Sequence, residues 1–405
     1  MYENLAVIAL FAFVFSGFAG RVERSVVTGP IIFITFGLFA GPMGVGLLDI
    51  NLDTTQLRVI ADLTLALVLF IDAANAELAV LRSHSHIPRR MLLIGLPLTI
   101  ALGVLCGLPL FPGVSVLELC ALATMLAATD AALGKAVVTN KAVPARIRES
   151  LNAESGLNDG LCVPVLLLFL ALASGQNNEN GNTELALTLM AEEIGTGALV
   201  GLGLTGLGTL LVVYCWRRGW ITEVWMQIPV VVLAFACFAT AQSLHGSGYI
   251  AAFMGGLLFG HLAKSATHRL VLAAEGAAEL LAMLAWVTFG AAVIGQSWNA
   301  MTWQIVLYSA LSLTVVRMLP VVLALRGTGE PLESKLFLAW FGPRGLASIV
   351  FAIIVAKAHL PHESVILHVV VCTVTLSVLV HGVTANPLSA AFAARMKRHD
   401  HDTGQ

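Results

Sequence analysis

The chain has 405 residues, of which 58% are hydrophobic and 11% are charged, and its mean hydropathy is +0.88. Soluble domains carry about 25% charged residues, so this composition excludes a soluble protein and indicates a polytopic membrane protein. The formal net charge of -2 and the lack of a long Lys/Arg run argue against nucleic acid as a partner. The six cysteines all fall in apolar segments without CxxC spacing, which favours packing over disulfides or zinc binding.

Apolar windows of membrane-spanning length recur along the whole chain. A helix that crosses a bilayer needs roughly 17–25 residues, and such windows predict an all-α protein with thirteen transmembrane helices. Their approximate limits are 3–20, 26–48, 56–80, 90–111, 113–138, 146–173, 188–216, 223–243, 246–263, 272–295, 301–325, 332–357 and 363–385. The first window lacks a basic leading segment and a small-residue cleavage site, so we interpret it as a retained helix and not as a signal peptide.

Basic residues gather in alternate connections between these windows. One set of connections, together with the C-terminal end, holds 17 of the 22 lysines and arginines, whereas the opposite set has only Arg58 and Lys357 near helix ends. The positive-inside rule therefore predicts an N-terminus outside and a C-terminus in the cytoplasm, in a multi-pass protein of the cell (inner) membrane. We expect a single transporter domain over residues 1–398 and a short cytoplasmic tail over 399–405.

Two of the predicted helices contain features that interrupt a helix. The first and eighth predicted helices run in opposite directions through the membrane, as inverted-topology repeats require, and a broken helix in each repeat marks the transport site. The fifth window is interrupted by the polar pair Thr129-Asp130. The corresponding twelfth window contains the segment 341–345, in which Pro343 lacks a backbone donor. The pattern predicts irregular backbone at both places.

Polar residues accompany the first of these interruptions. Asp130 lies in the fifth predicted helix, and Glu154 and Asp159 lie in the sixth, where an ionisable group costs roughly 2.5–3.5 kcal/mol on insertion scales. Helical spacing places Ser155, Asn158 and Asp159 on one face of the sixth helix. Two carboxylates, a hydroxyl and an amide suit a proton or a hard monovalent cation, so this cluster predicts an ion pathway.

Three stretches carry a resemblance to a known family. ATD in the fifth window, VPARIRESLNAESGLNDG in the sixth and FGPRGLAS in the twelfth resemble the cation/proton antiporters of the NhaP and NHE type, although Ala131 stands where that family usually has proline. The resemblance covers essentially the whole membrane domain. It implies a homodimeric sodium/proton exchanger of thirteen helices, with inverted repeats, two crossing unwound helices and no cofactor. Core helices would span approximately 90–173 and 301–385, and dimerisation helices approximately 3–80 and 223–295.

The resemblance also assigns roles to individual residues. It implies that Asp159 is the carboxylate that binds the ion and the proton, and that Na⁺ is held by Asp130, Ser155 and Asp159. Thr129 would add a ligand through its backbone or hydroxyl. Asn158 marks the pattern associated with electroneutral exchange.

Five further ionisable residues receive structural or accessory roles. The resemblance implies that Glu154 pairs with Arg344. We interpret this pair as structural, because a paired buried charge orders helices and does not exchange ligands. Asp72 lies in the third window, at the position where the family commonly has a glutamate. A structural role and a functional role are equally open for it. Lys135, one turn beyond Asp130, and Arg317 are accessory candidates. On an intact helix Lys135 would point away from the site.

These observations favour a secondary transporter and not an enzyme. The sequence contains no HExxH, GxSxG or P-loop motif, and a single acidic cluster next to broken helices is typical of alternating access and not of an open pore. We therefore predict electroneutral exchange of one Na⁺ (or Li⁺) for one proton, serving pH and sodium homeostasis. A K⁺/H⁺ antiporter is the main alternative, and a cation channel is a weaker one.

Overall fold

The structure is a computed structural model. It describes residues 2–22, 25, 27–48, 54–75, 86–130, 133–138, 140, 142–177, 183–222, 224–263 and 267–403. The α-helices of these ranges are α1 (Tyr2–Val22), α2 (Gly29–Ala40), α3 (Thr54–Asn75), α5 (His86–Arg90), α6 (Leu96–Leu110), α7 (Val116–Met125), α8 (Lys135–Val138), α9 (Ala145–Asn177), α10 (Thr183–Arg217), α11 (Pro229–Ser243), α12 (Gly248–Ala263), α13 (Thr267–Thr288), α14 (Gly295–Ser297), α15 (Trp303–Leu313), α16 (Val315–Ala324), α17 (Leu332–Trp340), α18 (Leu346–Lys357) and α19 (Glu363–Thr403). The π-helical segments η1 (Met91–Gly95) and η4 (Phe289–Ile294) and the 3₁₀ turns η2 (Trp225–Gln227) and η5 (Trp298–Ala300) complete them.

The predicted all-α class is confirmed, since every regular element in the described ranges is helical. Within the described part of the chain, seven helical stretches are long and apolar enough to cross a membrane: Tyr2–Val22, His86–Leu110, Ala145–Ser174, Leu187–Arg217, Leu270–Ile294, Trp303–Ala324 and Glu363–Met396. Shorter apolar helices, such as α2, α7, α11, α12 and α18, lie between them. The count of thirteen crossings stays a prediction.

Both expected interruptions are present. In the fifth predicted window α7 ends at Met125, and the next described helix, α8, begins only at Lys135. In the twelfth window α17 ends at Trp340 and α18 begins at Leu346. Pro343 lies between these two helices, where it cannot donate a helical hydrogen bond. Each of the two windows therefore contains two helical pieces, and the described residues between the pieces are irregular.

The start of α7 is fixed by its own sequence. Ser115 and Glu118 form a capping box, in which the Glu118 N–H donates to Ser115 Oγ at 3.2 Å and the Ser115 N–H donates to Glu118 Oε2 at 3.0 Å. These bonds satisfy two of the backbone donors that a helix leaves unpaired at its N-terminus. The beginning of the first broken helix is thus specified locally, whereas its end depends on contacts with other helices.

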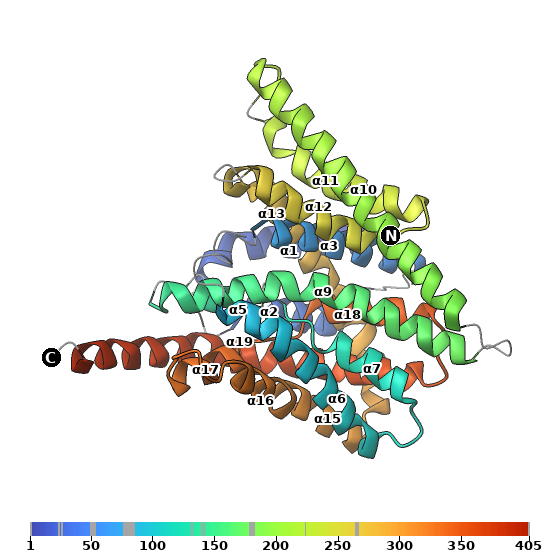
Figure 1. The fold of residues 1–405 in the computed structure, drawn as a ribbon, viewed down its shortest axis with the longest axis vertical. Coiled ribbons are helices and arrows are strands. Elements are labelled where there is room, and N and C mark those ends of the chain that lie inside the picture. Colours follow the sequence, from blue (N-terminus) through green and yellow to red (C-terminus); the bar gives the residue numbers. More distant parts are fainter. Residues whose placement is uncertain are drawn as a thin grey trace.

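The helices pack in two groups with α9 between them (Figure 1). In one group α12 packs against α3, α10 and α11, while α13 packs against α2 and α3. In the other, α7 packs against α6 and α18, and α19 packs against α15 and α18. Helix α9 contacts α3, α10 and α12 on one side and α7, α8 and α17 on the other. The helix that carries the predicted acidic cluster therefore lies where the two groups meet.

Glycines allow the closest of these approaches. A Cβ atom on Gly256 of α12 would lie 2.3 Å from the backbone oxygen of Phe70 in α3. A Cβ atom on Gly201 of α10 would lie 2.3 Å from the backbone oxygen of Ala251 in α12. Small residues at such contacts let helix backbones approach each other in a bilayer, where packing replaces the hydrophobic effect as the driving force.

Candidate ion-binding site at two broken helices

The two interruptions contact each other through Asp130. The Asp130 N–H donates to the backbone oxygen of Pro343 at 2.9 Å, and its Oδ2 accepts from the N–H of Leu346 at 2.9 Å. Leu346 is the first residue of α18, so the carboxylate lies at the positive end of that helix. Gly345 is required here, because a Cβ atom at this position would lie 1.9 Å from Asp130 Oδ2.

Helix α9 holds the first interruption in place through two side chains. Ser155 Oγ donates to the backbone oxygen of Thr129 at 2.8 Å. The Asn158 amide donates to the backbone oxygen of Ala127 at 3.0 Å and to Thr129 Oγ1 at 3.2 Å. Thr129 Oγ1 lies 3.4 Å from Ser155 Oγ. The structure therefore brings Thr129, Asp130, Ser155 and Asn158 together, and it gives Asn158 a contact with the irregular backbone; its contact with an ion stays a prediction.

Asp159 completes the cluster from the same face of α9. Its side chain is buried, and its Oδ1 has no hydrogen-bond partner among the described residues. The charges of Asp130, Asp72 and Glu154 act on it, and its carboxylate accepts a hydrogen bond from the Thr129 backbone. A buried carboxylate oxygen without a donor is costly unless a proton or a cation neutralises it. Asp159 is therefore the group in this cluster that is best suited to take up either one.

The expected ion pair between Glu154 and Arg344 is wrong. Glu154 instead accepts from Arg317 of α16, with Nη1 at 2.8 Å from Oε1 and Nη2 at 3.1 Å from Oε2, and each side chain is 2% exposed. The Arg344 Nη1 donates to the backbone oxygen of Gly342 at 2.8 Å, while its Nε and Nη2 have no hydrogen-bond partner in the described part of the chain. Arg317 extends from a regular helix toward α9, whereas Arg344 follows the irregular backbone and folds back onto it.

Of the three accessory candidates, Arg317 pairs with Glu154, Asp72 lies next to the cluster, and the Lys135 side chain is not described. Half-buried Asp72 of α3 lies against α9, where a Cβ atom on Gly156 would come within 3.1 Å of the Asp72 backbone oxygen and 3.4 Å of its Cβ. Gly156 follows Ser155 directly, so Asp72 is next to the cluster. Lys135 begins α8, but its side chain lies outside the described residues.

One contact at the first interruption was not predicted from the sequence. Ser348 of α18 donates through Oγ to the backbone oxygen of Met125, the last residue of α7, at 2.8 Å. This bond satisfies a carbonyl that the end of α7 leaves without a helical partner. Ser348 is the final residue of the FGPRGLAS stretch, so the sequence did draw attention to it. Its partner could not be inferred, because a hydroxyl in a membrane helix usually bonds within its own helix.

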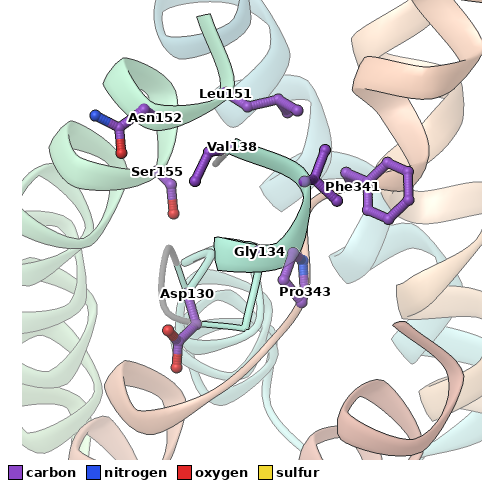
Figure 2. A pocket seen from close by; sticks show the side chains of 9 residues that line it. Asp130, Gly134, Val138, Leu151, Asn152, Ser155, Phe341 and Pro343 are labelled. Carbon is purple, nitrogen blue, oxygen red and sulfur yellow. The ribbon is translucent and has the colours of Figure 1, made fainter. Parts of the chain in front are cut away.

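A narrow pocket leads to part of the cluster (Figure 2). Asp130, Ser155 and Pro343 line it together with Gly134, Val137, Val138, Leu151, Asn152 and Phe341. Asn152 is exposed, whereas Ser155, one turn further along α9, is buried. The pocket therefore connects the surface near α8 with the hydroxyl and carboxylate of the site.

A multi-pass helical membrane protein in which two interrupted helices meet at buried carboxylates has the architecture of a secondary transporter. The family model described as "Sodium/hydrogen exchanger, transmembrane" matches residues 6–391. The chain belongs to this family, whose members are transporters and not enzymes.

Relatives and solved structures agree with this assignment. The chain is 21% identical over 391 residues to the K⁺/H⁺ antiporter NhaP of Alkalimonas amylolytica, covering 95% of this chain and 66% of that protein. It is 26% identical over 349 residues to a Na⁺/H⁺ antiporter of Saccharomyces cerevisiae, covering 80% of this chain and 34% of that protein. The chain thus spans less than two thirds of the length of these relatives.

The fold is similar to that of a solved antiporter. The sodium proton antiporter MjNhaP1 of Methanocaldococcus jannaschii superposes with a TM-score of 0.75 at 19% sequence identity, covering 96% of this chain and 98% of that one. This likeness confirms the predicted antiporter fold.

Proposed function

We propose that the protein exchanges a monovalent cation, Na⁺ or Li⁺, for a proton across the cell membrane, for pH and sodium homeostasis. The observation that carries the proposal is the buried Asp159 Oδ1, which lacks a hydrogen-bond donor among the described residues and lies beside Asp130 where the two broken helices meet. Oxygen ligands of this kind suit a hard cation, and the same carboxylate suits a proton.

Competition for one carboxylate couples the two fluxes. Asp159 binds either a proton or the cation, and Asp130, Ser155 and Thr129 contribute further oxygen ligands when the cation is bound. Either occupant neutralises the Asp159 charge, and a neutral site crosses the low-dielectric barrier at lower cost than a charged one. The pocket beside α8 gives access to Asp130 and Ser155 from one side of the membrane. In the proposed topology that side is the cytoplasm.

The exchange is one cation for one proton. Asn158 occupies the position next to Asp159, and an amide does not titrate in the physiological range, so this pair of residues carries one proton. Lys135 is the alternative source of a second proton. A dependence of the exchange rate on membrane potential would indicate that source.

The proposed assembly is a homodimer in the cell (inner) membrane with the N-terminus outside and the C-terminus in the cytoplasm. Helix α1 has no buried residue and exposes large apolar side chains such as Leu10, Phe13 and Phe18, so it can face lipid or a second copy of the chain. The approximate ranges 3–80 and 223–295 form the dimerisation helices, and 90–173 and 301–385 form the transporting core. The distribution of basic residues supports the orientation.

Exchange of K⁺ for protons is the second candidate, because the Alkalimonas relative is named a K⁺/H⁺ antiporter. The test is exchange in proteoliposomes that contain the purified protein, with a pH-sensitive dye inside. A pulse of Na⁺, Li⁺ or K⁺ is applied to a preformed pH gradient, with choline as the control cation. A saturable, proton-coupled response to Na⁺ and Li⁺ supports the proposal, and a response to K⁺ alone supports the second candidate. Cation flux without proton movement would overturn both and indicate a channel.

A further inference from the structure

A buried polar pair on α19 contacts the second broken helix. Ser377 and His381 lie four residues apart on α19 and are 0% and 1% exposed. Neither belongs to the acidic cluster around Asp159. Both contact backbone groups at the interruption between α17 and α18, where the Trp340 oxygen also accepts from the Gly342 N–H at 2.9 Å.

The pair contacts both ends of the interruption through short hydrogen bonds. The Arg344 N–H donates to Ser377 Oγ at 2.7 Å, and Ser377 Oγ lies 3.2 Å from His381 Nδ1. On the other side of the ring, His381 Nε2 lies 3.0 Å from the backbone oxygen of Trp340. His381 Nδ1 also lies 3.1 Å from the backbone oxygen of Ser377, so both ring nitrogens face a carbonyl oxygen, which only accepts. Ser377 lies inside the continuous helix α19, where its backbone oxygen is already a helical acceptor. We therefore assign the proton of the neutral ring to Nε2, which then donates to Trp340, and Nδ1 accepts from the Ser377 hydroxyl.

This pair spans the whole interruption. Trp340 is the last residue of α17, and Arg344 precedes Gly345, the N-cap of α18. A bilayer offers no water to satisfy a free carbonyl or N–H, so irregular backbone at membrane depth must find partners in neighbouring helices. Ser377 and His381 supply one acceptor and one donor to the two ends of this segment.

The same segment places Asp130. The backbone oxygen of Pro343 accepts from the Asp130 N–H, and the Leu346 N–H donates to Asp130 Oδ2, both at 2.9 Å. Asp130 Oδ2 packs so closely against Gly345 that a Cβ atom there would overlap it. A shift of the segment would therefore move both the backbone and the carboxylate of Asp130.

We propose that Ser377 and His381 are positioning residues for cation binding, which act through the segment 341–345 on Asp130. The inference rests on the proposed exchange. It predicts that the pair affects cation affinity and not the turnover of the loaded protein. Asp159, which takes up the proton, lies in the continuous helix α9, so a shift of the segment 341–345 would leave it in place.

The chain offers variants that separate positioning from folding. His381→Gln keeps an amide N–H near the place of Nε2 and so preserves the donor to Trp340, whereas His381→Asn ends near Nδ1 and loses it. Ser377→Ala removes the acceptor for the Arg344 N–H. Thr375→Val is the matched control, since the half-buried Thr375 donates only to Val371 of its own helix, at 2.7 Å.

The first readout is the cation dependence of exchange in proteoliposomes. In Ser377→Ala and His381→Asn we expect the apparent KM for the cation to rise roughly tenfold, the size of effect that displacement of a ligand by a fraction of an ångström produces, while the maximal rate stays within about threefold. His381→Gln and Thr375→Val should keep the KM of the unchanged protein.

The second readout does not depend on transport. In detergent, the concentration of Na⁺ or Li⁺ that raises the melting temperature halfway should increase in the same two variants and in no other. The positioning role would be overturned if Ser377→Ala and His381→Asn kept the normal cation affinity and showed only a lower melting temperature or a lower maximal rate. Equal effects of His381→Gln and His381→Asn would do the same. If the unchanged protein showed no coupled exchange, the proposed function would be overturned. If, in addition, no cation shifted its melting curve, this inference would be overturned too.

Discussion

The ion pair between Glu154 and Arg317 should be a main determinant of the stability of the core. Both charges are buried, the contact is bidentate, and removal of one partner leaves the other charge uncompensated. Breaking such a pair typically costs about 3–5 kcal/mol. If the 405-residue chain unfolds as one unit, an unfolding entropy of about 2.1 cal/mol/K per residue converts this loss to a fall in Tm of about 4–6 °C. We expect this fall in Arg317→Met.

The assay is a set of melting curves in detergent, built as a double-mutant cycle. Arg317→Met, Glu154→Gln and the double variant give the coupling energy, which should be several-fold larger than the sub-kcal/mol values of exposed pairs. Arg344→Met is the matched control from the irregular segment. Its Nη1 contacts one carbonyl and its Nε and Nη2 contact no acceptor in the described residues, so we expect a smaller loss. Strong coupling of Glu154 to Arg344, with none to Arg317, would refute the assignment.

Three further predictions follow from the site. Asp159→Asn should abolish exchange and leave the melting temperature close to normal, because the amide carries neither the charge nor a titrating proton; coupled flux above one tenth of the normal rate, measured in proteoliposomes, would remove Asp159 from the central role. Gly345→Ala should weaken cation affinity, since its Cβ would overlap Asp130 Oδ2, whereas Gly276→Ala, where nothing lies within 4 Å, should have no effect; equal KM values for both would contradict this. With the membrane potential clamped by valinomycin and K⁺, the rate of Na⁺-driven pH change should not vary with potential; a dependence that disappears in Lys135→Ala would assign an extra charge to Lys135.

The parts of the fold that are set by local chemistry could be predicted from the sequence. Hydropathy placed the apolar windows, and the polar pair at Thr129 and Asp130 together with Pro343 located both interruptions, because each disturbs a helix irrespective of its neighbours. Helical spacing alone placed Ser155 and Asp159 on one face of α9. These inferences needed no knowledge of how the helices pack.

The parts that depend on distances between helices could not be predicted in this way. Both Arg317 and Arg344 fall within apolar windows, and sequence spacing does not say which one reaches Glu154. The partners of Ser348 and Ser377 were hidden for a related reason. A serine in a membrane helix ordinarily bonds to its own helix, and only the packing shows which irregular backbone it satisfies instead.

The interruptions explain why so many polar residues gather in this core. Backbone groups freed at membrane depth require partners, and side chains supply them: Ser155 and Asn158 at the first interruption and Ser377 at the second. Asp130 has two duties, because it is a proposed cation ligand and also accepts from the first N–H of α18.

Loss of transport after substitution of Asp130 would therefore not identify it as a ligand, since the same change removes a support of the irregular backbone. Asp159 differs in this respect. Its Oδ1 has no hydrogen-bond partner among the described residues, and an asparagine keeps a carbonyl oxygen that can still accept the backbone hydrogen bond from Thr129. Asp159→Asn therefore tests the chemistry of the ion and the proton with little change to the scaffold.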